Sequence, residues 1–310
     1  SGGDLLTFRQ AYGKVETLEP GEENIQNFDF TNKNKSHLAK VGFDFYLNDT
    51  NTISVYTTQN INNETGKSNV NVIFDNPADN INQIFDSKND NYTQTYNFDY
   101  KKKFKKEGHT LEFEGNYSNN NNEENSEFNN PAAKNDITNK GENILLNLDY
   151  VNPLTETIKL ETGLETRIEN TTNNFLLNGA YNSNFNYERR IYSAYTTIAK
   201  QWNKWNAQVG ARFEKYTADA LFKKVNENDG TFNDDLFTVY PSGFVTYTPS
   251  DNDSFNFSVS KRVDRPSIDQ VNPIREWSTP LIDSEGNPEL YPQFTNSVEL
   301  NYTRKTKIGS

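Results

Sequence analysis

The chain has 310 residues, lacks Cys and Met, and carries a formal net charge of −12. The acidic balance argues against nucleic-acid binding, which calls for basic patches, and the missing Cys excludes disulfides and thiolate metal sites. Only 33% of the residues are hydrophobic, yet 13% are aromatic. A disordered chain would hold few aromatics, and a soluble core would need more aliphatic residues. The composition is typical of a barrel with an apolar outer band and a wet interior.

Most of the chain alternates between apolar and polar residues with the two-residue period of a β-strand. Residues 5–15 and 25–31 are weaker candidates, so the pattern leaves the N-terminal strands of residues 1–35 unassigned. The longest run extends from Ile158 to Ile168, about the length that spans a membrane when tilted. The same alternation recurs in residues 41–47, 96–101, 111–117, 146–150, 205–214, 255–260 and 298–302.

Short segments of turn-forming residues separate these strands near residues 50, 107, 153, 203 and 251. Long segments rich in Asn, Asp, Glu and Ser lie between them, at residues 60–71, 75–91, 118–141 and 170–186. We therefore expect short periplasmic turns and long extracellular loops. Tyr150, Trp202, Trp205 and Tyr247 lie beside short turns, as expected for an aromatic girdle at the membrane surface.

The predicted fold is all-β, an antiparallel up-and-down transmembrane β-barrel over residues 36–310. The last predicted short turn falls near residues 305–310, where the sequence stops, whereas a complete barrel usually ends on a strand. We therefore expect about 11–13 strands of a larger barrel. The absence of Met indicates that Ser1 is not a native start. A soluble all-β protein such as a tandem sandwich would also alternate, but its strands are usually shorter.

The polar face of the strands should line the barrel lumen. The candidates for contact with a transported substrate are Glu161, Glu165, Arg167, Arg212, Glu214 and Arg262. His37 and His109 have no partner at metal-ligand spacing and no nearby catalytic serine pattern. We predict no metal, no cofactor and no enzymatic activity.

A motif near the C-terminus follows the strand at residues 255–260. It consists of Arg262, Arg265, Pro266, Asn272, Pro273, Gly286, Asn287 and Pro288. Pro266 has no backbone N–H and therefore ends the strand. The motif resembles that of the outer-membrane β-barrel family in TonB-dependent receptors of the Bacteroidetes, except that Gln293 stands where the family usually has Glu. We favour a rigid extracellular loop over the barrel mouth; the alternative is a ligand-contacting loop.

The resemblance covers most of the chain from about residue 36 and implies a bacterial outer-membrane protein in contact with lipid. It implies a barrel of about 22 strands and a plug domain through which the TonB complex opens the pore. No plug is recognisable before residue 36. A surface lipoprotein is a further partner left open, and the transported substrate is not indicated. Two other functions stay open: a plug-less structural or secretion-associated barrel, and a soluble β-rich surface binding protein.

Overall fold

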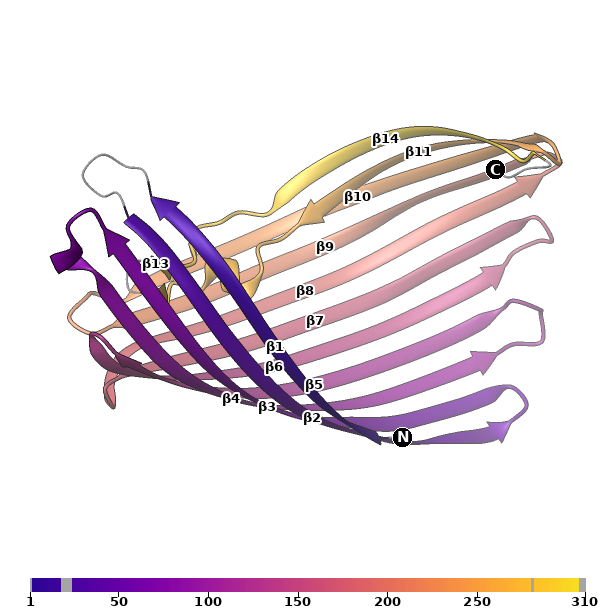
Figure 1. The fold of residues 1–310 in the computed structure, drawn as a ribbon. Helices are drawn as coiled ribbons and strands as arrows, with labels where there is room; N and C mark the ends of the chain where they lie inside the picture. The colour runs from indigo at the N-terminus through magenta and orange to yellow at the C-terminus, as the bar shows by residue number, and fades with distance from the viewer. Residues whose placement is uncertain (1, 18–23, 280–281, 307–310) are drawn as a thin grey trace.

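The computed structural model describes residues 2–17, 24–279 and 282–306. Its main feature is an antiparallel sheet of 12 strands that pair in chain order. The strands are β1 (Gly2–Thr17), β2 (Asn24–Asn48), β3 (Asn51–Phe74), β4 (Ile81–Lys103), β5 (Thr110–Asn129), β6 (Ala132–Pro153), β7 (Ile158–Leu177), β8 (Ala180–Trp202), β9 (Trp205–Lys224), β10 (Gly230–Ser250), β11 (Asp253–Asp264) and β14 (Gln293–Arg304). Figure 1 shows the sheet curving into an open trough between β1 and β14. The predicted all-β partial barrel is confirmed.

The chain reverses direction at the turns that the sequence predicts near residues 50, 107, 153, 203 and 251. Most of the turn predicted near residues 305–310 lies outside the described residues. The turn from β8 to β9 has two residues: Trp202 pairs with Trp205, and Asn203 has a φ of 48°. Asn tolerates the left-handed conformation that a two-residue hairpin requires. At this end of the sheet, rings 4.3–6.5 Å apart stack in the order Trp202, Trp205, Tyr247, Phe255 and Tyr302. The row includes three of the side chains predicted for the aromatic girdle.

The prediction of long irregular loops is wrong, because most of those residues are in strands. β3 continues to Phe74, β5 to Asn129 and β7 to Leu177. The turns that follow are short; the one after β7 has positive φ at Asn178 and Gly179. Asn, Asp and Glu have low strand propensity, but backbone pairing is continuous here and side chains bond across it, as Asn63 Nδ2 does with Asp90 Oδ1 at 2.6 Å.

Of the N-terminal segment expected to stand apart, residues 2–17 and 24–35 belong to the 12-stranded sheet. The segments 25–31 and 41–47, predicted as separate strands, both lie in β2. β1 pairs with β2 from Asn24 to Ala39, across the expected boundary at residue 36. The 12-stranded sheet is therefore continuous through this point. In the described part of the chain, no helix is long and apolar enough to cross a membrane.

The two faces of the sheet exchange polarity about halfway along the strands. On β9, Val209 and Phe213 are exposed on the convex face, while Glu214 is buried on the concave face. Beyond this level the concave face becomes apolar, with Tyr216 and Ala218 buried. The convex face is therefore apolar in the half of the sheet that ends at the turns near residues 50, 107, 153, 203 and 251. The concave face is apolar in the opposite half, here called the far half.

The hydrophobic core lies on the concave face of the far half. It contains Ile137, Phe175, Phe185, Tyr187, Ile191, Tyr216 and Ala218 from the sheet, together with Val271 and Ile274. These last two belong to the connection between β11 and β14, which also holds α1 (Ile268–Val271), β12 (Glu276–Thr279) and β13 (Ile282–Ser284). Figure 1 shows this connection inside the trough. A short 3-10 helix, η1 (Pro77–Asp79), precedes β4.

Candidate functional site on the concave face

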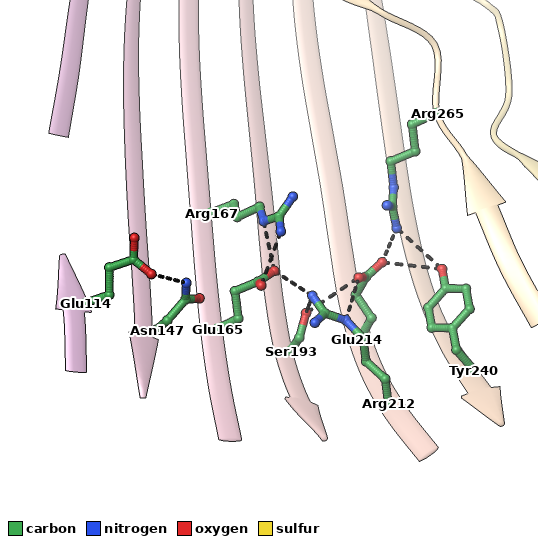
Figure 2. Close-up of polar contacts among 9 residues, drawn as sticks. All are labelled: Glu114, Asn147, Glu165, Arg167, Ser193, Arg212, Glu214, Tyr240 and Arg265. Carbon is green, nitrogen blue, oxygen red and sulfur yellow. Dashed lines mark hydrogen bonds and ion pairs between the residues drawn. The ribbon is translucent and has the colours of Figure 1, made fainter. Parts of the chain in front are cut away.

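A row of ion pairs crosses the concave face from β7 to β9. Arg212 Nη2 lies 2.5 Å from Glu165 Oε1, and Arg167 Nε lies 2.8 Å from the same oxygen. Arg212 Nε also lies 3.4 Å from Glu214 Oε2. Figure 2 shows these side chains in a row across neighbouring strands. The structure thus brings together Glu165, Arg167, Arg212 and Glu214 from the predicted set.

The register of the sheet explains why this row forms. Glu165 pairs with Ser193, and Ser193 pairs with Glu214. Residues paired in this way lie close together on one face. Ser193 is buried; its hydroxyl accepts a hydrogen bond from Arg212 Nη2 at 2.7 Å and donates one to Glu214 Oε2 at 3.5 Å. Sequence reasoning missed Ser193, because alternation defines a face but not the register between strands.

Arg265 connects this row to the segment inside the trough. Its guanidinium forms an ion pair with Glu214 Oε1 and donates to the Tyr240 hydroxyl at 3.3 Å. It also lies over the ring of Tyr216, 4.9 Å from the centroid. The side chain of Glu214 is only 5% exposed and that of Arg265 is 17% exposed. A nearly buried carboxylate of β9 is therefore paired with a cation at the start of the β11–β14 connection.

Glu161 and Arg262, the other two predicted residues, lie outside this row. Glu161 pairs with Lys159 at 2.7 Å and accepts a hydrogen bond from the Thr197 hydroxyl at 3.4 Å. Alternation along β11 places Arg262 on the concave face, but the residue is exposed. Within the described residues it makes none of the contacts of the row. Arg265, which the sequence suggested only as part of the motif, makes them instead.

The two halves of the C-terminal motif are joined by backbone hydrogen bonds. The amide of Gly286 donates to the carbonyl of Asn272 at 2.8 Å, and that of Asn287 donates to Gln270 at 2.7 Å. A capping box between Ser267 and Gln270 begins α1. The motif is thus a compact unit whose buried side chains pack on the concave wall.

We expect Gly286→Ala to disrupt this unit. An added Cβ would lie 2.6 Å from the Asn272 carbonyl oxygen and 2.8 Å from the Asp269 carbonyl oxygen, and backbone atoms cannot move aside cheaply. Overpacking of this kind costs about 1–3 kcal/mol. Mass-spectrometric hydrogen exchange should therefore find the amides of Gly286 and Asn287 exchanging roughly 10–100 times faster. The control is Gly141→Ala, where the new methyl meets no atom within 4 Å; equal acceleration in both variants would contradict the prediction.

Comparisons with known proteins agree with the fold. The model of a family described as "Outer membrane protein beta-barrel family" matches residues 102–310. No curated protein sequence matches the chain. Among solved structures, the ferric-catecholate import receptor Fiu from E. coli is similar with a TM-score of 0.62 and 12% identity, over 99% of this chain and 55% of that one.

Two other solved structures are also similar. FpvA of P. aeruginosa, bound to a heterologous pyoverdine, has a TM-score of 0.60 and 12% identity over 97% of this chain and 45% of that one. The ferric yersiniabactin uptake receptor FyuA from Yersinia pestis has a TM-score of 0.53 and 10% identity over 97% and 52%. At this identity the likeness shows the fold alone. The chain spans about half the length of these three proteins.

Proposed function

Because the chain belongs to the outer membrane protein beta-barrel family, we propose that it forms part of the barrel wall of a TonB-dependent transporter or receptor. The family places the chain in the bacterial outer membrane. The receptors with similar folds are named for import or uptake of iron complexes. Their identity to this chain is too low to indicate its cargo, so the proposal covers transport and leaves the substrate open.

The observation that best supports this proposal is the ion-pair row of the concave face. At the level of Glu165 and Arg212, the convex face carries exposed apolar side chains such as Leu164 and Phe213. Charges are tolerated within a membrane where they face a protein interior or a water-filled cavity. We therefore assign the convex face to lipid and the concave face to the lumen. A lumen wall with paired charges and a folded inward segment suits a gated channel.

The proposed partners are the outer-membrane lipid and the TonB complex, which would act through a plug domain. A surface lipoprotein is a further proposed partner. The proposal includes no catalytic role. Among the described residues, His37 contacts the exposed Asp4, and His109 stacks on Phe104 and contacts the Tyr150 hydroxyl at 3.0 Å. Neither arrangement resembles a nucleophile activated by a base.

The experiment that tests the proposal is the intact mass and N-terminal sequence of the native protein, extracted in detergent from outer membranes. A barrel of about 22 strands needs roughly 550 residues, or about 60 kDa, before a plug is added. We expect a mass well above this value, an N-terminal plug and capture of the native protein by the periplasmic domain of TonB. A native mass near 35.6 kDa without capture would overturn the proposal and favour a plug-less barrel.

A further inference from the structure

A cavity of about 560 Å³ lies on the concave face beside the ion-pair row. Three arginines line it, each from a different part of the chain: Arg167 from β7, Arg189 from β8 and Arg265 from the β11–β14 connection. Leu145 and Ile191 line it as well, so an apolar surface adjoins the three guanidinium groups. Glu169 is the carboxylate of the lining. The lining side chains therefore carry a net positive charge in a chain that is strongly acidic as a whole.

The carboxylates that pair with these arginines are less exposed than Arg167, the most exposed of the three. Arg167 is 58% exposed, whereas its partner Glu165 is 13% exposed. A guanidinium has five N–H donors, and Glu165 accepts from only two nitrogens of Arg167, Nε at 2.8 Å and Nη2 at 3.2 Å. Figure 2 shows the remaining amino group of Arg167 directed away from Glu165. Arg167 can therefore bind a second anion without losing its ion pair.

The other two arginines are held in place by their own carboxylates. Arg189 pairs with Glu169, and Arg265 pairs with Glu214. Both arginines are less than a quarter exposed, so their positions are fixed before any ligand arrives. Preorganised guanidinium groups recognise carboxylate and phosphate oxygens through paired hydrogen bonds. The apolar floor beside them lowers the local dielectric and strengthens such bonds.

We propose that this cavity is an anion-binding subsite, which takes a carboxylate or phosphate group attached to an apolar or aromatic moiety. The assignment of the group to a cargo rests on the proposed transport function; anion binding itself does not. Lipid phosphates are not the expected source of the anion, because the cavity opens on the concave face, whereas the exposed apolar side chains assigned to lipid are on the convex face. Leu145 and Ile191 predict that an aromatic carboxylate binds more tightly than a bare inorganic ion.

The test uses the native full-length protein in detergent and two probes, inorganic phosphate and phthalate, titrated by calorimetry at constant ionic strength. The variants are Arg167→Gln and Arg189→Gln. The matched control is Arg190→Gln, which changes the next residue along β8, on the convex face and paired with Glu188. We expect saturable binding, tighter for phthalate, that falls about tenfold in each cavity variant and is unchanged in the control.

Arg167→Lys separates charge from geometry, since lysine keeps the charge but lacks the two-pronged donor. We expect its affinity to lie between those of the wild type and Arg167→Gln; this variant also serves if Arg167→Gln does not fold. Absence of saturable binding, or equal losses in the cavity and control variants, would overturn the proposal. TonB capture of the same preparations tests the transport function separately, so a protein that is captured but binds neither probe refutes only the subsite.

Discussion

Replacing Arg265 with alanine will destabilise the protein by about 3–5 kcal/mol, the usual cost of removing one partner from a buried ion pair. The reason is the carboxylate left behind: Glu214 is 5% exposed and sits beside Tyr240 and Ser193, which cannot neutralise it. Arg212 remains as a weaker partner at 3.4 Å. The β11–β14 connection will also lose its attachment to β9. The free energy of unfolding, from urea titration in lipid vesicles, measures the effect.

The matched control is Arg262→Ala, which removes the same side chain three residues earlier from an exposed site. This variant should change stability by less than about 0.5 kcal/mol. Adding Glu214→Gln to the Arg265→Ala variant removes the uncompensated charge, so the double variant should be more stable than Arg265→Ala alone. If Arg262→Ala cost as much as Arg265→Ala, the ion pair with Glu214 would not be what stabilises the wall.

Leu164→Arg will destabilise the inserted protein by about 2–4 kcal/mol, as expected for arginine on the lipid face near the middle of a bilayer. Leu164 is 56% exposed on the convex face of β7, near the centre of the alternating segment from Ile158 to Ile168. Its neighbour Glu165 points into the ion-pair row on the concave face. An arginine placed one position along the strand would therefore face the lumen, and the loss expected for a lipid-facing arginine would not apply. Unfolding titrations in vesicles of defined thickness measure the loss.

The control for this variant is Asn170→Arg, on the same face of β7 but beyond the alternating segment that ends at Ile168. There the new guanidinium remains in water, so we expect a change within about 0.5 kcal/mol. Equal losses of stability in the Leu164 and Asn170 variants would show that the lipid-facing part of the convex face does not end between these two residues. No loss at Leu164 would place the convex face away from lipid and would contradict the assignment of the two faces.

The faces of the strands could be predicted from the sequence because side chains alternate with the backbone pleat. Alternation along β7 and β9 therefore predicts that Glu165, Arg167, Arg212 and Glu214 lie on the polar, lumen-facing side. The neighbours of these residues could not be predicted. Ser193 joins the row only through the register of β8 with β7 and β9. Arg265 meets Glu214 across 51 positions of sequence, by a path that depends on how the segment after Pro266 folds inward.

The outer halves of the strands were missed for a different reason. Residues 118–125 are all Asn, Glu or Ser, a composition typical of loops. In the structure they pair along their whole length with β4 and β6, so strand formation there depends on neighbouring strands rather than on local preference. The exchange of polarity between the two faces also weakens the pattern, because the apolar side of each strand changes partway along it.

The same exchange of polarity determines what surrounds the entrance to the barrel. About ten residues of each long strand lie beyond the part of the convex face assigned to lipid, so in the proposed arrangement a stiff wall would project roughly 25 Å from the bilayer. Its outside is wetted and its inside is lined by aromatic and aliphatic side chains. If these strand ends face outward, as the sequence predicts, molecules approaching from the medium would meet a stiff wall on this part of the barrel rather than a mesh of mobile loops. Proteases and antibodies would find access mainly at the tight turns along its upper edge, such as Asn178–Gly179.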